Sequence, residues 1–252
     1  MPEFDPETAL ALWHRIIKRR HIIPLSRALR LKLTDDEIAY IDLFSNLYRA
    51  IAAVSGKPIV IDSGKVAYHS ALMQWAGERI QWREVHLVRD PRAVAFSRQR
   101  IKQNTNVTDG KALMVRHGPM RVSGRWLWAN SLIWASRRKN TPTTRVVYET
   151  LADFPAAEMT RLTHTLDLTS QAEAEKTFKP LETGSYMPPA GVAFSGNSSR
   201  FDRKQTKIRP DDEWKTSLPT HDRRVVTVLT WPLRGLFRPQ HPDSTQNRFS
   251  ER

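Results

Sequence analysis

The chain has 252 residues, no cysteine and a formal net charge of +14 at pH 7. The absence of cysteine excludes a disulfide framework and a thiolate zinc site. No apolar run is long enough to cross a bilayer, so we expect a cytoplasmic protein with no transmembrane segment. A hydrophobic fraction of 40% with eight tryptophans predicts a globular fold. The positive charge favours anionic ligands, and nucleic acid is one candidate partner; the alternative is an ordinary solvated basic surface.

Two helices are predicted in the first 57 residues. Apolar residues repeat at helical spacing from Pro6 to Arg20, and Pro24 ends that segment. Thr34 and Glu37 have the spacing of a capping box, which predicts a long second helix ending at Gly56. The buried stripe expected on this helix consists of Ile38, Ile41, Phe44 or Leu47, Tyr48 and Ile51.

The segment from Val85 to Arg100 predicts a strand, a tight turn and a helix. A short apolar run with β-branched residues precedes Asp90 and Pro91. Aspartate is a preferred N-cap residue and proline is common at the first helical position, so a helix is expected to begin here. Arg89 then stands at the carboxyl end of the strand, where ligands of α/β sheets bind and where a helix N-terminus favours an anion. Its guanidinium could bind a phosphate, with a hydrogen bond from Ser97. The alternative is that Arg89 only closes the strand and pairs with Asp90.

A similar unit is predicted from Pro58 to Ala76. The run PIVI, residues 58–61, is expected to be a strand, and a helix is expected from Val66. Between them Ser63 and Lys65 could hold an oxyanion together with backbone N–H groups. The turn is not a Walker A sequence, because the preceding glycine is missing. The alternative is a plain strand-to-helix turn with Asp62 as its cap.

The remaining elements complete an α/β prediction. A helix is expected from Met120 to Lys139, a third strand from Thr143 to Tyr148 and a helix from Pro155 to Leu166. Three strand-to-helix units in succession favour a parallel sheet with flanking helices, in a helix-rich α/β fold.

The C-terminal third begins with a region rich in Gly, Pro, Ser and Asn, from Gly184 to Pro210. It could close over a phosphate or be a surface linker. Two helices are expected at 211–217 and 222–237, the second directing Val225, Val228 and Leu229 inward, with a turn at Trp231 and Pro232. We expect a single domain over 1–237, with a helical segment at 1–57 and an α/β core at 58–237. The tail at 238–252 is expected to be disordered.

Four passages, in this order, resemble the bacterial sulfotransferases that use 3′-phosphoadenosine 5′-phosphosulfate as sulfuryl donor. The passages are IVIDSGK (59–65), VHLVRDPRAVAFSRQR (85–100), RVVYETLADFP (145–155) and SGNSSRF (195–201) followed by DDEWKTSLPTHDRRVVTVLTWPL. The likeness covers most of 58–237. It implies a P-loop NTPase-like sulfotransferase fold, a nucleotide donor as co-substrate, no metal, and a small molecule or glycan with a hydroxyl as acceptor.

The resemblance also implies roles for individual residues. Arg89 and Ser97 match the pair that holds the donor's 3′-phosphate, and Lys65 matches a lysine near the 5′-phosphosulfate. Ser63 matches a family serine, whereas Gly64 replaces the second. The closing loop is matched by Gly196, Asn197 and Arg200.

The chain departs from the family at its beginning. The family's opening strand and Arg-Ser-Gly-Ser-like phosphosulfate loop have no counterpart before Pro58. The expected fold therefore lacks its first strand, and the hypothesis of a truncated or inactive nucleotide-binding remnant stands beside that of an active enzyme.

In an active enzyme, catalysis would rest on positioning and positive charge, with Lys65 at the leaving group. Asp62 and His69 are candidates for the general base, each with a structural alternative as a helix cap or a solvated histidine. His86 lies within a strand and is expected to be a core residue.

A basic nucleic-acid-binding protein is the third hypothesis. It is motivated by the net charge and by seven lysines and arginines with no acid between Arg15 and Lys32. A long solvated basic helix face is the alternative explanation of this run.

Overall fold

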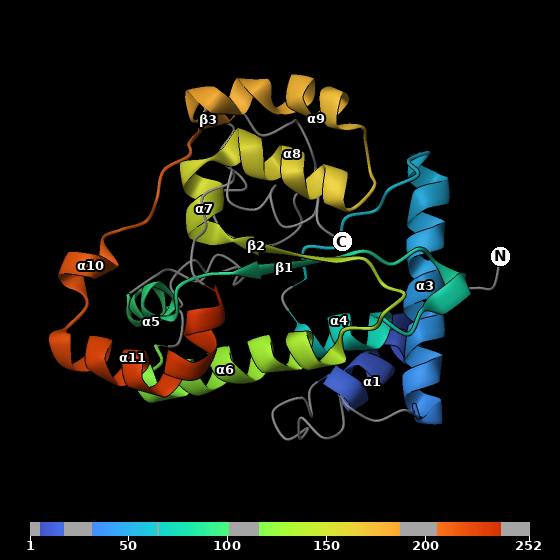
Figure 1. The fold of residues 1–252 in the computed structure, drawn as a ribbon. Helices are drawn as coiled ribbons and strands as arrows, with labels where there is room; N and C mark the ends of the chain where they lie inside the picture. The colour runs from blue at the N-terminus through green and yellow to red at the C-terminus, as the bar shows by residue number, and fades with distance from the viewer. Residues whose placement is uncertain (1–5, 18–31, 65, 101–115, 187–205, 238–252) are drawn as a thin grey trace, which may run out of the picture. The chain divides into compact units, whose positions relative to one another are not determined.

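The computed structural model describes residues 6–17, 32–64, 66–100, 116–186 and 206–237 (Figure 1). The fold is helix-rich α/β, with a small two-stranded parallel sheet. The chain forms two compact units, the first from Met1–Glu84 and Trp128–Thr143, the second from Val85–Leu127 and Thr144–Arg252. Each unit is described below by itself.

The first unit is helical. Its described elements are α1 (Pro6–Ile17), α3 (Asp35–Ser55), α4 (Ala67–Met73), the 3-10 helix η2 (Gly77–Arg79) and the second half of α6 (Pro119–Ser136). The predicted capping box is confirmed, since the Glu37 carboxylate accepts from the Thr34 N–H at 2.8 Å and the Thr34 hydroxyl accepts from the Glu37 N–H at 3.3 Å. Gly56 ends α3 with φ 63°, a left-handed conformation that favours glycine.

The core of the first unit forms where α1, α3, α4 and α6 pack together. Its most deeply buried large side chains are Ile17, Tyr40, Ile41, Met73 and Leu132. The face that α3 buries differs in part from the predicted stripe, because Ile38 is 38% exposed and Ile51 is 42% exposed. Glu37 is buried on this helix instead, and the Tyr68 hydroxyl donates to its carboxylate. Glu37 can be buried because Tyr68 satisfies its carboxylate, and the pattern of apolar residues alone does not predict this.

The second unit contains the sheet, apart from the first residue of each strand. Strands β1 (Glu84–Val88) and β2 (Thr143–Val147) lie side by side, as predicted for both segments (Figure 1). Burial alternates along β1, where Glu84, His86 and Val88 are buried. His86 is therefore a core residue, as predicted, whereas Leu87 is 54% exposed.

The predicted strand at 58–61 is wrong, because these residues have no regular secondary structure. Ile59 is 50% exposed and Ile61 is 87% exposed, so this apolar run is not packed into a sheet. A strand needs a hydrogen-bonded neighbour, and among the described residues the parallel sheet consists of β1 and β2 alone. The Asp62 carboxylate instead accepts from the Gly64 N–H at 2.6 Å, which stabilises a local turn.

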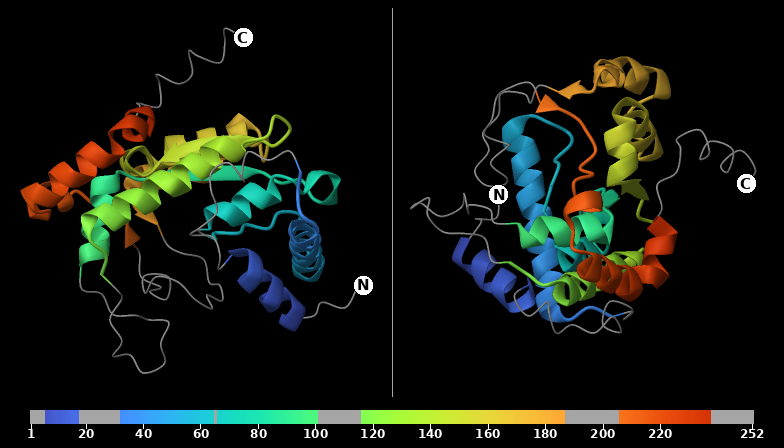
Figure 2. Two further views of the ribbon diagram at one scale, coloured as in Figure 1. Left: turned by 90° about the horizontal axis from the view of Figure 1, so that it is seen from below. Right: turned by 90° about the vertical axis from the view of Figure 1, so that its left-hand side faces the viewer.

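The helix after β1 follows the prediction closely. α5 (Pro91–Gln99) begins with proline, and its N-cap Asp90 accepts from the Arg92 N–H at 2.8 Å. α5 packs against α10 (Trp214–Ser217) and α11 (Thr220–Arg234), and Figure 2 shows α5 and α11 side by side. The buried residues at these contacts include Ala93, Phe96, Trp214 and Leu218, with Ala95, Val122 and Val226 in a second cluster.

The inward face predicted for α11 is wrong for two residues. Val226 and Thr230 are fully buried, whereas Val228 is 72% exposed and Leu229 is 39% exposed. Several valines in succession are compatible with more than one helix face, and the packing against α5 selects the one that contains Val226. The expected turn at Trp231 and Pro232 lies within α11, and the chain turns afterwards in the 3-10 helix η5 (Gly235–Phe237).

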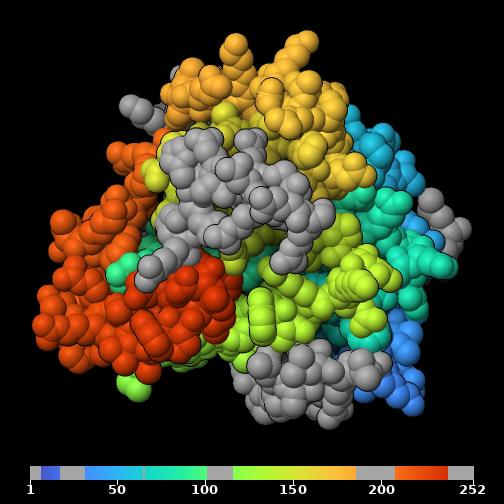
Figure 3. Space-filling model, in the orientation of Figure 1, coloured from blue at the N-terminus to red at the C-terminus, as the bar shows by residue number. Residues whose placement is uncertain are grey.

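The remaining elements of the second unit are helical except for one short antiparallel pair. They are α7 (Tyr148–Asp153), α8 (Pro155–Thr165), α9 (Gln171–Phe178), the 3-10 helix η3 (Lys179–Thr183), β3 (Ser185–Tyr186) and β4 (Thr206–Lys207). The surface formed by α8 and α9 is seen at the top of Figure 3. Among the described helices, none has the length and apolar character needed to span a membrane.

Candidate functional site

The first candidate site is a network of four polar side chains in the first unit. His69, on α4, lies between two tyrosines of α3 and the turn after residue 61. Its Nδ1 is 2.8 Å from the Tyr40 hydroxyl, and its Nε2 is 3.0 Å from the Tyr48 hydroxyl. The Tyr48 hydroxyl donates to Asp62 Oδ2 at 2.5 Å, and this oxygen is 3.5 Å from His69 Nε2. The structure thus brings together the two predicted general-base candidates.

One arrangement of protons satisfies every contact around a neutral imidazole. The Tyr40 hydroxyl donates to Nδ1, Nε2–H donates to the Tyr48 oxygen, and Tyr48 donates to Asp62. This chain runs in one direction and ends on a carboxylate.

The network holds its groups in defined protonation states. Contact with His69, followed by the hydrogen bonds from the Tyr48 hydroxyl and the Gly64 amide, keeps the pKa of Asp62 well below its usual range. Burial raises the pKa of Tyr40 and Tyr48 above the ordinary tyrosine value, and the negative charge of Asp62 adds to both shifts. Asp62 is therefore ionised and both tyrosines are neutral at neutral pH.

Aromatic side chains enclose the imidazole. The Phe44 ring lies 4.9 Å from the ring of His69, and the Trp82 ring lies 6.1 Å away, both in edge-to-face orientation. The side chain of His69 is 12% exposed and that of Asp62 is 30% exposed. The carboxylate thus forms the more accessible end of the network.

Tyr40 and Tyr48 were not among the predicted site residues. Their signal in the sequence is the spacing of Tyr40, Phe44 and Tyr48, which puts all three on one face of α3. Such a stripe also fits an ordinary core. Only the packing of α4 against α3 brings His69 to it.

The second candidate site surrounds Arg89 in the second unit, at the end of β1. The guanidinium donates to Asp211 Oδ2 at 2.7 Å and lies over the Tyr148 ring, 4.6 Å from its centroid. The Trp126 indole N–H donates to the Arg89 carbonyl at 2.9 Å, which holds the strand end in place. Nε of Arg89 is buried and has no hydrogen-bond partner among the described residues.

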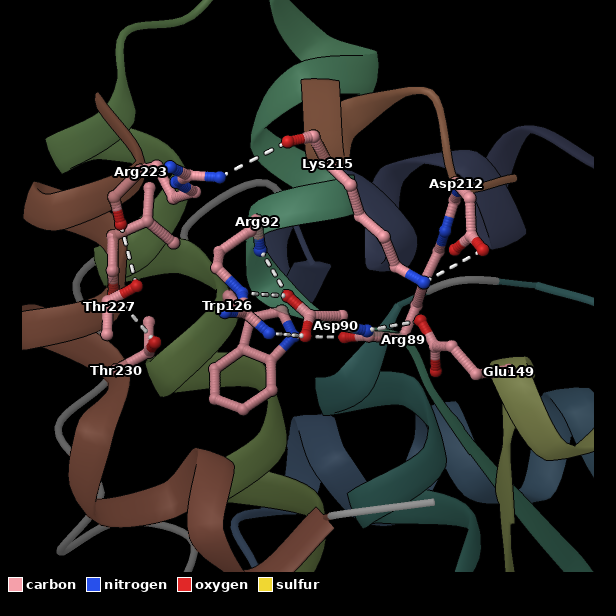
Figure 4. A network of polar contacts seen from close by, with 11 residues as sticks. Arg89, Asp90, Arg92, Trp126, Glu149, Asp212, Lys215, Arg223, Thr227 and Thr230 are labelled. Carbon is pink, nitrogen blue, oxygen red and sulfur yellow. Dashed lines mark hydrogen bonds and ion pairs between the residues drawn. The ribbon is translucent and has the colours of Figure 1, made fainter. Parts of the chain in front are cut away.

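The alternative pairing of Arg89 with Asp90 is wrong. Asp90 pairs with Arg92, whose Nη2 lies 2.6 Å from its Oδ2, while Arg89 pairs with Asp211 (Figure 4 shows Arg89, Asp90 and Arg92). Arg100 approaches the same Asp211 at 3.7 Å. A single carboxylate therefore accepts from one arginine and lies close to a second.

A partly buried acid lies beside this strand end. The Glu149 carboxylate accepts from the Asp90 N–H at 2.9 Å (Figure 4). Burial raises the pKa of Glu149 above the usual glutamate value, and the hydrogen bond from Asp90 opposes this shift in part. Glu149 fixes the turn between β1 and α5 from the first turn of α7.

The predicted donor-site residues fall into three groups. Arg89 and Ser97 belong to the second unit, with Ser97 half-buried on α5. Asp62, Ser63 and His69 belong to the first unit, and Ser63 lies in the turn between Ile61 and α4. The rest lie outside the described residues, namely Lys65, Gly196, Asn197 and Arg200. A common donor site therefore remains a prediction.

Comparisons with protein-family models, curated proteins and solved structures find no match to this chain. Within the part of the chain that the structure describes, no cluster of three or more His, Asp or Glu side chains could hold a metal ion.

Proposed function

We propose that the chain is a sulfotransferase-like protein that binds 3′-phosphoadenosine 5′-phosphosulfate and transfers its sulfuryl group to a hydroxyl of a small molecule or glycan. The observation that carries this proposal is the environment of Arg89. A guanidinium at the end of a parallel strand, next to a helix N-terminus, already binds an oxyanion, the Asp211 carboxylate at 2.7 Å.

The residues around Arg89 fit a phosphate group. Its Nε has no partner among the described residues, so the guanidinium can donate to a second oxygen. Stacking on Tyr148 restricts the guanidinium to one plane. A phosphate dianion that displaced Asp211 would replace one negative charge with two at the same donors.

The network of the first unit contains Asp62 and His69, the two residues proposed to receive a proton. Sulfuryl transfer forms a bond from the acceptor oxygen to sulfur and breaks the bond from sulfur to the donor's bridging oxygen. The acceptor hydroxyl must lose its proton as this happens. In the proposed mechanism the Asp62 carboxylate, the more accessible end of the network, takes up that proton, while Tyr48 and His69 hold the carboxylate in place.

The roles of the remaining donor-site residues rest on the family resemblance alone. Lys65 would stabilise the leaving group, with Ser63 beside it, and Ser97 would assist Arg89 at the 3′-phosphate. The closing loop would contribute Gly196, Asn197 and Arg200.

Calorimetric titration with adenosine 3′,5′-bisphosphate tests the donor site. We expect binding by the parent protein and a loss of about 10- to 100-fold in affinity for Arg89→Ala, because one charged bidentate contact is removed. Arg121→Ala on α6 removes an equal charge from an exposed position and should bind like the parent. Absence of binding by the parent, or equal binding by Arg89→Ala, contradicts the proposal.

Radiolabelled sulfuryl transfer to a panel of hydroxyl acceptors then tests the reaction. His69→Gln and Asp62→Asn should retain nucleotide binding and lose transfer. Nucleotide binding by the parent without transfer to any acceptor would instead favour the catalytically inactive remnant.

A further inference from the structure

A basic cavity lies in the second unit between α5, α10 and α11. It has a volume of about 370 Å³ and is lined by Arg92, Trp214, Lys215, Arg223, Arg224 and Thr227, with Val228 as an apolar edge. Four of these side chains are cationic and none is acidic. Figure 4 shows Arg92, Lys215, Arg223 and Thr227 in this region.

Only part of this positive charge is neutralised. Arg92 pairs with Asp90, and Lys215 pairs with Asp212 at 2.8 Å. Arg223 donates to the Lys215 carbonyl at 3.2 Å, an uncharged acceptor. Among the described residues, neither Arg223 nor Arg224 forms an ion pair with a carboxylate. Two cationic groups therefore face the cavity without a carboxylate partner.

The neighbouring contacts hold the lining side chains in place. The Arg92 guanidinium lies over the Trp214 ring, 4.5 Å from its centroid, and donates to Asp90 from Nε at 2.9 Å and from Nη2 at 2.6 Å. The Thr227 hydroxyl donates to the Arg223 carbonyl at 2.7 Å, and its oxygen remains able to accept. The cavity is thus bordered by the Arg92 guanidinium, the Trp214 indole and the guanidinium groups of Arg223 and Arg224.

We propose that this cavity binds a small ligand carrying two or more phosphate or sulfate groups. Guanidinium groups bind such oxyanions through paired, charge-assisted hydrogen bonds. The volume is that of a small-molecule site, which suits a phosphorylated or sulfated sugar or polyol. This site uses neither Arg89 nor the network of the first unit, so it stands independently of the sulfotransferase proposal.

Calorimetric titration with inorganic pyrophosphate in the Arg89→Ala background tests the site, because the arginine of the proposed donor site is then absent. We expect one binding event that weakens with added salt. Adding Arg223→Gln and Arg224→Gln should weaken it about 10- to 100-fold, since two charged donors are lost while the aliphatic stems remain. Circular dichroism of each variant checks that it is folded.

The matched control removes two positive charges elsewhere in the same unit. Lys176 and Lys179 are exposed on α9 and at its C-terminal end, and changing both to Gln should leave pyrophosphate binding unchanged. The proposal is overturned if pyrophosphate fails to bind at millimolar concentration, or if the Arg223/Arg224 and Lys176/Lys179 variants lose the same affinity.

Titration with an inositol bisphosphate and with a disulfated disaccharide then identifies the ester class. Tight binding of duplex DNA in place of all three small anions would overturn it in favour of nucleic acid.

Discussion

The Asp62–His69 network and the arginine clusters of the second unit balance their charges in different ways. In the network, an acid, an imidazole and two phenols form one continuous chain of hydrogen bonds. In the cavity at α11, cationic groups outnumber the carboxylates that pair with them, and Nε of Arg89 has no partner among the described residues. A satisfied network positions protons, whereas an excess of donors binds an anion supplied from outside. The comparison therefore supports the two proposed roles, which are proton transfer in the network and anion binding at the arginines.

Removing the buried phenol of Tyr40 from the network should have the largest effect on stability. Tyr40 is fully buried, so Tyr40→Ala is expected to lower the free energy of unfolding by about 3–5 kcal/mol through the cavity it leaves. Tyr40→Phe keeps the ring and removes only the hydroxyl that contacts His69, for an expected loss of about 1–2 kcal/mol. Urea unfolding of both variants measures the difference. Equal losses would mean that the hydroxyl, and not packing, dominates.

The raised pKa values of Tyr40 and Tyr48 predict a loss of stability in alkali. Below pH 10 both phenols are neutral in the folded and unfolded states, so their contribution is complete. As the pH rises above 10, the unfolded chain releases these protons and the folded chain retains them, so stability falls by at most about 1.4 kcal/mol per pH unit for each phenol. Phenolate absorbance should show both tyrosines titrating only with unfolding. In Tyr48→Phe the alkaline loss should be smaller.

The lowered pKa of Asp62 predicts that stability falls as the pH is lowered in acid. Its contribution is complete above the unfolded value near pH 4 and is lost as the pH falls further through the folded value. Because the carboxylate is partly exposed, we expect a contribution of about 1 kcal/mol. Urea unfolding at pH 6 and pH 3 should therefore show a smaller difference for Asp62→Asn than for the parent. The same difference in both proteins would contradict the role of Asp62 in the network.

The smallest expected effect concerns the carboxylate that occupies Arg89. Asp211→Asn removes a competing negative charge, so the affinity for adenosine 3′,5′-bisphosphate should rise about fivefold. Glu182→Gln on η3 removes an equal charge from an exposed position and should leave the affinity unchanged. A loss of affinity in Asp211→Asn would show that Asp211 orients Arg89 and does not compete for it.

The sequence correctly predicted the helix and strand boundaries that depend on residues close together in the chain. The Thr34 capping box, the Asp90-Pro91 helix start and the strand before it are all present, because each depends on residues within one or two turns. The prediction failed at 58–61, where the same apolar pattern needs a strand partner from elsewhere in the chain. It failed on α11 because several helix faces are comparably apolar.

In the candidate sites, too, some features follow from neighbouring residues and others from tertiary packing. The sequence by itself determined that Arg89 stands at a strand end before a capped helix, since strand, N-cap and proline are contiguous. Only the tertiary structure decided that Arg89 pairs with Asp211, that Tyr40 and Tyr48 bind His69, and that Arg92 and Arg223 line one cavity. The physical reason is that hydrogen bonds and charge pairing depend on distances of a few ångströms, and packing sets these distances between residues far apart in the chain.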